Sequence, residues 1–298
     1  MESDKNNTIK WDFSNQKYGD HKDQILDIKI PEKKNAHAIV YIHGGAYMVG
    51  DKSQYPSFLA AYSKNSIIAA INYRMVKDST NVCMEDILSD VNAAMAKITG
   101  ISGAHNVSIK DFILLGHSAG GHIALLYSYK YPRERTKVSA CLSLAGPTDF
   151  TDDLSWSRMT MWGENFKERL AFFSVLGSLL TGREIKLKQA YWTLQKNYAE
   201  FKKYILDISP VAYVSEANKN PPTLLVHARS DNQVPYSNAV RLKTALAAVS
   251  VPHKLITPVG TANNHMLGGE CHGDNSPVFY ENQPWVAKAM DWLEKHLE

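Results

Sequence analysis

The sequence is poor in cysteine and lacks a long apolar run. Its three cysteines, Cys83, Cys141 and Cys271, lie far apart, and no two of them form a C-x-x-C pair. This spacing suggests neither a zinc knuckle nor a disulfide framework, so we expect a reducing compartment. No stretch reaches the roughly 20 apolar residues of a spanning helix, and the polar residues 1–8 do not read as a signal peptide. The expectation is a cytoplasmic protein without stable membrane insertion.

The sequence also lacks an excess of charge of either sign. Its 33 Lys and Arg and 30 Asp and Glu give a formal net charge of +3, which is too small for the basic surface that displaces counterions from nucleic acid. Nucleic acid is therefore not expected as a partner. Hydrophobic residues make up 44% of the chain, enough for a large core. Because there is no long linker and no internal repeat, we predict a single domain over residues 1–298.

Short apolar runs alternate with helical patterns along most of the chain. This order predicts the α/β class, with a mostly parallel central sheet flanked by helices. The expected strands are rich in Ile, Val, Leu and Ala, as strands buried on both faces must be, and span residues 25–30, 38–42, 67–72, 112–115, 140–144, 223–227 and 254–257. The expected helices span residues 85–98, 120–129, 237–247 and 284–296.

One long segment breaks this alternation. Residues 151–206 contain no convincing strand but many large apolar side chains, so we predict a helical cap insertion between two strands of the sheet. Within it, apolar residues recur at steps of four and three, at Leu187, Tyr191, Leu194, Tyr198, Phe201 and Ile205. The favoured interpretation of this stripe is a helix packed on its own domain, and a membrane-surface helix is the alternative.

A G-x-S-x-G pattern occurs at residues 116–120, between an expected strand and an expected helix. A nucleophile elbow needs this context, because its serine sits in a strained turn and small neighbours let strand and helix come close. The pattern therefore predicts Ser118 as a nucleophile. The alternatives are a glycine-rich turn of another α/β fold and a phosphate-binding loop, although no lysine follows to reach a phosphate.

A second glycine-rich loop, residues 43–47, follows the expected strand 38–42. Main-chain N–H groups at such a place can stabilise the negative oxygen of a tetrahedral intermediate. We expect the donors to be Gly45, Ala46 and Ala119, the last of which follows the predicted nucleophile. We expect His43 to pin this loop by hydrogen bonding rather than to transfer protons.

A serine nucleophile needs a histidine base, and the base needs a carboxylate that orients it. Asp231 and His265 follow the ends of two expected strands, in the chain order Ser, Asp, His. We therefore predict the triad Ser118, Asp231 and His265, with His272 as the weaker alternative base. The spacing of His265, Cys271 and His272 fits no standard zinc pattern, so neither a metal nor an organic cofactor is expected.

These motifs together resemble the esterase and lipase branch of the α/β-hydrolase superfamily. The His-Gly-Gly loop is similar to that of hormone-sensitive-lipase-like carboxylesterases and kynurenine formamidase-like enzymes. The resemblance extends from about Tyr18 to the C-terminus and includes residues 72–74 and 231–235. Ala46 and Ala228 depart from it, because they stand where glycine is usual. The resemblance implies an α/β-hydrolase fold whose variable cap is the insertion before Leu206.

The motifs and the resemblance point to one function. We expect a serine hydrolase that cleaves small-molecule carboxylic esters of small to medium acyl or aryl groups through an acyl-enzyme. Tyr47, Met48 and Trp162 are expected to line an apolar substrate pocket, although ordinary packing explains each of them equally well. An amidase, formamidase or peptidase with the same triad is the alternative, and a non-catalytic ligand-binding module is a remote one. Whether the chain forms a homo-oligomer is left open.

Overall fold

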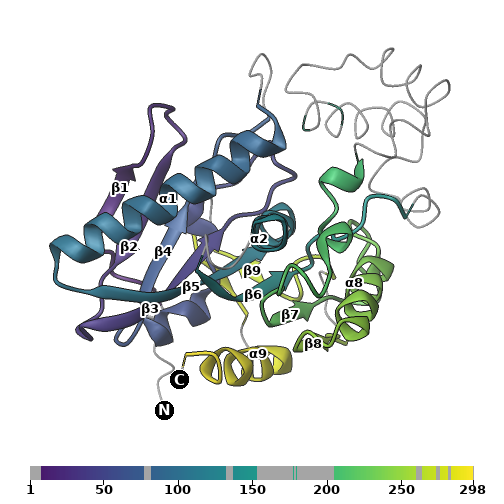
Figure 1. Cartoon of the computed structure of the whole chain (residues 1–298). Coiled ribbons are helices and arrows are strands. Elements are labelled where there is room, and N and C mark those ends of the chain that lie inside the picture. Colours follow the sequence, from purple (N-terminus) through teal and green to yellow (C-terminus); the bar gives the residue numbers. More distant parts are fainter. Residues whose placement is uncertain are drawn as a thin grey trace.

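The computed structural model describes residues 8–76, 82–131, 137–152, 177, 179, 205–259, 264–272, 276–280 and 283–297. These residues form an eight-stranded sheet in the order β1-β2-β4-β3-β5-β6-β7-β8 (Figure 1). Strand β2 pairs antiparallel with both β1 and β4, and all other neighbours in this sheet are parallel. The predicted α/β class, with a mostly parallel sheet flanked by helices, is confirmed.

The strands of this sheet are β1 (Phe13–Lys17), β2 (Ile25–Lys29), β3 (Asn35–Ile42), β4 (Ile67–Ile71), β5 (Ser108–His117), β6 (Val138–Leu144), β7 (Thr223–Val226) and β8 (His253–Ile256). A separate antiparallel pair joins β9 (Glu270–Cys271) to β10 (Val278–Phe279). The α-helices that lie wholly within the described residues are α1 (Met84–Ala104), α2 (Ala119–Lys130), α8 (Tyr236–Ala248) and α9 (Pro284–Glu294). Three short 3₁₀ helices are η1 (Lys52–Gln54), η2 (Ser57–Tyr62) and η4 (Pro210–Tyr213).

The central strands are buried on both faces, which explains their apolar sequences. Side chains of β3 alternate between two hydrophobic clusters: Val40 and Ile42 belong to one cluster, and Ile39 and Tyr41 belong to the other. Residues of α1, α2 and α8 complete the first cluster, and residues of η2 and α9 complete the second. The core is therefore two apolar layers with the sheet between them.

The connection between β6 and β7 contains the predicted cap. These two strands pair directly, with Cys141 opposite Thr223, although residues 145–222 separate them in the chain. Of the predicted insertion 151–206, the structure describes residues 151, 152, 177, 179, 205 and 206. Leu179 and Ile205 are buried in the first cluster. Trp162 and the stripe from Leu187 to Phe201 lie outside the described residues, so the extent of the cap and of the single domain stay predictions.

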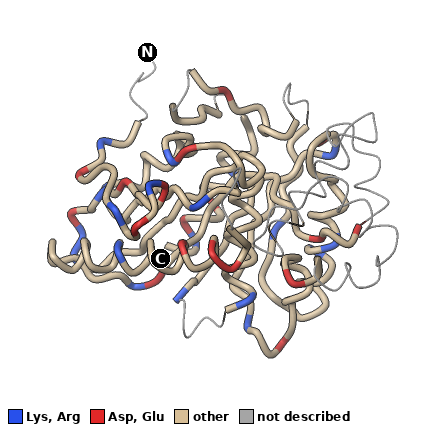
Figure 2. Tube along the Cα trace, turned by 90° about the horizontal axis from the view of Figure 1, so that it is seen from above, with Lys and Arg blue, Asp and Glu red and all other residues tan. Residues whose placement is uncertain are grey.

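Charged residues of both signs are interspersed over the described part of the chain (Figure 2). This distribution agrees with the small net charge of +3. Among the residues described, no helix is long and apolar enough to cross a membrane. The cysteines Cys83, Cys141 and Cys271 are all free.

Candidate active site

Ser118 lies in the tight turn between β5 and α2. Its φ of 51° and ψ of −120° form a backbone conformation that residues with a side chain rarely adopt. Two main-chain hydrogen bonds hold it there. The N–H of Ser118 donates to the carbonyl of Leu144 at 2.7 Å, and the carbonyl of Ser118 accepts from the N–H of His122 at 3.0 Å. The strained serine is thus fixed by β6 on one side and by the first turn of α2 on the other.

The two glycines of the motif are required by close approach of the main chains. A Cβ atom on Gly116 would lie 2.2 Å from the carbonyl carbon of Gly120. A Cβ atom on Gly120 would lie 2.0 Å from the carbonyl oxygen of Ile42, the last residue of β3. No real Cβ atom tolerates such distances, so any side chain here would push α2 away from the sheet. The G-x-S-x-G spacing follows from this packing.

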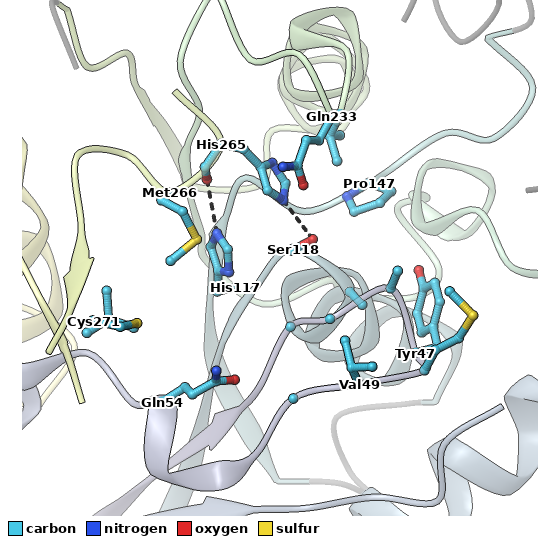
Figure 3. A pocket seen from close by; sticks show the side chains of 18 of the residues that line it. Tyr47, Val49, Gln54, His117, Ser118, Pro147, Gln233, His265, Met266 and Cys271 are labelled. Carbon is cyan, nitrogen blue, oxygen red and sulfur yellow. Dashed lines mark hydrogen bonds between the residues drawn. The ribbon is translucent and has the colours of Figure 1, made fainter. Parts of the chain in front are cut away.

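The structure brings Ser118, His265 and Asp231 together, although they come from three separate loops at the carboxyl ends of strands. The Nε2 atom of His265 lies 2.9 Å from Ser118 Oγ (Figure 3). The Nδ1 atom of His265 lies 3.0 Å from Asp231 Oδ2 and 3.2 Å from Oδ1. With its proton on Nδ1 and donated to the carboxylate, His265 can accept the proton of Ser118 at Nε2. The catalytic roles of the three residues stay predictions.

Asp231 is held by several donors besides His265. Its Oδ1 atom accepts main-chain hydrogen bonds from Gln233 at 2.8 Å and from Val234 at 2.9 Å. The Nε2 atom of His227 lies 3.2 Å from Oδ2. Burial alone would raise the pKa of Asp231, but the hydrogen bonds from His227 and His265 outweigh burial and hold this pKa well below its ordinary value. Asp231 is therefore a carboxylate at neutral pH.

His117, which precedes the predicted nucleophile, contacts the predicted base. Its Nε2 atom donates to the main-chain carbonyl of His265 at 3.0 Å, and the two rings lie 5.1 Å apart. Burial, together with the nearby imidazole of His265, lowers the pKa of His117 to about 4. His117 is therefore neutral at neutral pH and tethers the loop that carries His265.

The glycine-rich loop after β3 lies next to Ser118. A Cβ atom on Gly44 would be 3.2 Å from the Cβ atom of Ser118. His43 donates from Nδ1 to the carbonyl of Gly44 at 2.7 Å and stacks on Tyr73, so it holds the loop by hydrogen bonding. That Gly45, Ala46 and Ala119 supply oxyanion donors stays a prediction, although all three line the same cavity as Ser118.

A cavity of about 550 Å³ opens at Ser118 and His265 (Figure 3). Its size is typical of small-molecule sites. Tyr47 and Met48 both line it, but Tyr47 is buried and its hydroxyl is bonded to His122, whereas Met48 is partly exposed. The other walls are mostly apolar and include Tyr41, Val49, Phe150, Met266 and Val278. Gln54 and Cys271 lie across the cavity from Tyr47 (Figure 3).

The structure also describes His272, the alternative base. His272 packs its ring on Phe279 at 5.0 Å, and the imidazole that contacts Ser118 is that of His265. Among the described residues, no group of three or more His, Cys, Asp or Glu side chains is arranged to hold a metal ion.

No sequence motif assigns a function to His117, His122 or His227. Each is a buried histidine of the elbow or of the loop that carries Asp231. The partners of His117 and His122 cannot be read from local patterns, because His117 and His265 are 148 positions apart and His122 and Ile208 are 86 positions apart. His227 contacts Asp231, which is close to it in sequence. The only available signal was their proximity in sequence to Ser118 and Asp231.

Comparison with known proteins identifies the family. The BD-FAE family profile matches residues 26–246, a span that includes the loop after β3, the elbow and Asp231. The chain belongs to the BD-FAE family. This membership places the chain in the esterase branch of the α/β-hydrolases and confirms the resemblance drawn from the motifs.

Relatives of this BD-FAE protein carry esterase names. The isoprenylcysteine alpha-carbonyl methylesterase ICME of Arabidopsis thaliana is 22% identical over 255 residues, which cover 84% of this chain and 56% of that protein. The chain thus spans just over half the length of this relative. A truncated carbohydrate esterase from gut microbiota aligns with a TM-score of 0.66 and 17% identity over 95% of both chains. Esterase B from Lactobacillus rhamnosis aligns with a TM-score of 0.65 and 15% identity, over 95% of this chain and 84% of its own. These structures confirm the predicted α/β-hydrolase fold.

Proposed function

We propose that this BD-FAE protein is a serine hydrolase that cleaves carboxylic esters through a covalent acyl-enzyme. The observation that carries the proposal is the chain of hydrogen bonds from Ser118 Oγ through His265 to Asp231, at 2.9 and 3.0 Å, inside a cavity. The strained elbow at Ser118 and the glycine-rich loop beside it supply the other parts that acyl transfer needs.

In the proposed first step, Ser118 Oγ attacks the ester carbonyl and its proton passes to His265 Nε2. The carbonyl oxygen gains the negative charge, which the main-chain N–H groups of Gly45, Ala46 and Ala119 stabilise. The ester C–O bond then breaks while His265 protonates the departing alcohol. Water repeats the cycle with His265 as base and releases the acid. Asp231 remains ionised throughout and stabilises the imidazolium that forms on His265.

The cavity supports esters of small to medium groups. Its volume of about 550 Å³ and its mostly apolar walls suit a modest acyl or aryl group rather than a highly charged one. The names of the relatives include a methylesterase and a carbohydrate esterase. Because ester cleavage is what these names have in common, we propose it as the chemistry of this protein and leave the alcohol unassigned.

Covalent labelling tests the proposal directly. A neutral fluorophosphonate should modify the folded protein once, at Ser118, because only a serine with a paired base reacts quickly. Peptide mass spectrometry locates the adduct, and Ser118→Ala is the matched control that should take up no reagent. Hydrolysis of p-nitrophenyl esters of increasing chain length, alongside the matched anilides, then ranks ester against amide cleavage. Labelling at another serine, or no labelling of folded protein, would favour the non-catalytic binding module.

A further inference from the structure

The loop predicted to stabilise the oxyanion has a strained main chain. Gly45, Ala46 and Tyr47 have φ angles of 102°, 51° and 65°, so three consecutive residues lie in the left-handed region. Two of them carry side chains that disfavour this conformation. Within the loop, the N–H groups of Met48 and Val49 both donate to the carbonyl of Gly45 at 3.0 Å. Such strain persists only where the surroundings enforce it, so contacts outside the loop must help to hold it.

Tyr47 provides these contacts at both of its ends. Its carbonyl accepts a hydrogen bond from the N–H of Val76 at 2.8 Å. Its hydroxyl lies 2.9 Å from Nδ1 of His122, and the two rings meet edge to face with centroids 5.7 Å apart. Tyr47 is buried, and its hydroxyl is bonded to the protein.

The direction of this hydrogen bond follows from the second nitrogen of His122. The Nε2 atom lies 2.6 Å from the carbonyl oxygen of Ile208. A carbonyl can only accept, so Nε2 carries the proton and Nδ1 is the acceptor. The hydroxyl of Tyr47 therefore donates to His122. Burial lowers the pKa of His122 to about 4, which keeps the ring neutral and this arrangement intact at neutral pH.

His122 is also bound to the elbow. Its main-chain N–H donates to the carbonyl of Ser118 at 3.0 Å, one turn along α2. One residue thus contacts the strained loop through its side chain and the predicted nucleophile through its main chain. The ring of Phe150 packs edge to face on His122 with centroids 5.2 Å apart, and the N–H of Phe150 donates to Ser209 Oγ at 3.0 Å.

We propose that Tyr47 and His122 are positioning residues for the oxyanion site. The hydrogen bond from Tyr47 to His122 fixes the loop carrying Gly45 and Ala46 relative to Ser118, and the carbonyl of Ile208 selects the tautomer of His122 that accepts this bond. This inference rests on the proposed function. It gives Tyr47 a role other than substrate binding, and it gives the carbonyl of Ile208 the role of selecting the tautomer of His122.

The proposal predicts a specific kinetic effect. Oxyanion donors act on charge that develops in the transition state, so a misplaced loop should lower kcat and leave KM nearly unchanged. Removing one donor outright costs roughly 10² to 10³ in kcat. A loop that shifts but keeps its donors should lose less, and we expect a loss of about tenfold in kcat for Tyr47→Phe.

Two substitutions of His122 separate the effects of its two side-chain hydrogen bonds, to Tyr47 and to Ile208. His122→Asn places an acceptor oxygen near the position of Nδ1, so it keeps the partner of Tyr47 and loses Ile208. His122→Gln places a donor near Nε2, so it keeps Ile208 and leaves Tyr47 without its acceptor. Tyr129→Phe is the control. It also removes a buried tyrosine hydroxyl, but Tyr129 lies on α2, bonds to Thr223 at 2.7 Å and does not line the cavity.

The experiment measures kcat and KM for p-nitrophenyl acetate, inhibition by a short alkyl trifluoromethyl ketone, and thermal unfolding. The ketone forms a tetrahedral oxyanion adduct with an activated serine and therefore reports on the donors. We expect Tyr47→Phe and His122→Gln to lose about tenfold in kcat and a similar factor in ketone affinity. His122→Asn should stay within about threefold of wild type, and Tyr129→Phe should change stability alone.

The failures of the two proposals are distinguishable. If Ser118→Ala abolishes hydrolysis while Tyr47→Phe keeps full kcat and ketone affinity, the positioning role is wrong and the proposed function stands. Equal losses in His122→Asn and His122→Gln, tracking their loss of stability, would also overturn it. If Ser118→Ala remains active, the proposed function itself is wrong. Should Tyr47→Phe fail to fold, the comparison of His122→Asn with His122→Gln decides.

Discussion

The elbow that carries Ser118 and the loop that carries His265 bring Ser118 Oγ and His265 Nε2 within 2.9 Å of each other. Different kinds of contact hold the elbow and the loop in place. The elbow is fixed by main-chain hydrogen bonds and by the approach of Gly120 to the carbonyl of Ile42. The His265 loop is fixed by side chains from elsewhere. His117 donates to the carbonyl of His265 at 3.0 Å, and the indole of Trp285 donates to the carbonyl of Leu267 at 2.9 Å. The position of the nucleophile should therefore be sensitive to a carbon atom added at the glycines of the elbow. The position of the base should be sensitive to the loss of the polar side chains that bond to its loop.

The largest effect should come from breaking the pair itself. Ser118→Ala should lower kcat for ester hydrolysis by roughly 10⁴ to 10⁶, about 5 to 8 kcal/mol of transition-state stabilisation, because covalent catalysis disappears. His265→Ala should cost a similar amount. The double variant should be scarcely worse than either single one, since nucleophile and base fail for the same reason. Steady-state kinetics of the three variants measures this coupling.

Additive losses would contradict this prediction, because independent residues add in free energy. More than about a tenth of wild-type activity in Ser118→Ala would do the same. Asp231→Asn serves as the comparison within the same site. It should be milder than either single variant but still severe, since it misorients the imidazole or selects its wrong tautomer.

The next effect tests the main-chain side of the comparison. Gly120→Ala would place a Cβ atom 2.0 Å from the carbonyl oxygen of Ile42. We expect it to lower the free energy of unfolding by about 3 kcal/mol, because α2 must move away from the sheet. Gly100→Ala in α1 is the matched control, since its new Cβ atom would meet nothing within 4 Å.

Chemical denaturation of both glycine variants gives the free energies of unfolding. Alanine is the better residue inside a helix, so Gly100→Ala should raise stability by roughly 0.5 to 1 kcal/mol. A Gly120→Ala protein as stable as wild type would show that strand and helix tolerate separation. The elbow would then not depend on close main-chain packing.

Acid should weaken the side-chain supports. Burial lowers the pKa values of His117 and His122 to about 4, below the roughly 6.5 of an exposed histidine. Between these pH values the unfolded chain binds more protons than the folded one, so stability is complete above pH ~6.5 and falls towards pH ~4. Each histidine can account for up to about 3 kcal/mol of this loss. Asp231 stays ionised over this range, because its pKa is held below the ordinary value.

Unfolding free energies at neutral pH and near pH ~4.5 measure the acid effect. His117→Gln should lose less stability between these two conditions than wild type does, because one buried titrating group is gone. The same loss in both proteins would contradict the assignment of His117 as a neutral tether.

The smallest effect should come from a change at His227, which contacts Asp231 and reaches the reacting atoms only through Asp231 and His265. Its Nε2 atom lies 3.2 Å from Asp231 Oδ2 and 3.0 Å from the carbonyl of Val234, so the ring donates at Nε2. His227→Phe should lower kcat/KM about tenfold, or about 1.4 kcal/mol, by loosening the carboxylate that orients His265. His227→Gln keeps a donor near Nε2 and should recover most of the activity. No recovery in His227→Gln would mean that packing of the ring, and not its hydrogen bond, matters.

The comparison also explains which parts of the site were predictable. Ser118 could be located from sequence because its constraints are local: a strand, two glycines and a helix within a few residues. Asp231 and His265 could be placed at strand ends for the same reason. His117 and His122 could not be assigned, since hydrogen bonds to residues far along the chain define their roles. The partners of His227 are only four and seven residues away, but no motif marks them. Such pairings leave no periodic signal in the sequence.

The fold likewise contains elements that the local sequence predicts and elements that it does not. Strands buried on both faces were predicted within a few residues, because a run such as that of β4 is apolar throughout. Strand β1, with the sequence FSNQK, was not predicted, because an edge strand needs few apolar residues. Helix α1 extends to Ala104, beyond the predicted end at residue 98, because glycines such as Gly100 and Gly103 weaken a helix without necessarily ending it.

The pairing of β6 with β7 across residues 145–222 has a consequence for how this protein can diversify. The entropy of closing a flexible connection grows with the logarithm of its length, so doubling the length costs only about 0.6 kcal/mol. The start of the connection, just after β6, is held in place, because the N–H groups of Thr148 and Asp149 both donate to Asn238 Oδ1 at 2.8 Å. A lineage can therefore lengthen, shorten or exchange this connection while the strands that position Ser118 keep their register.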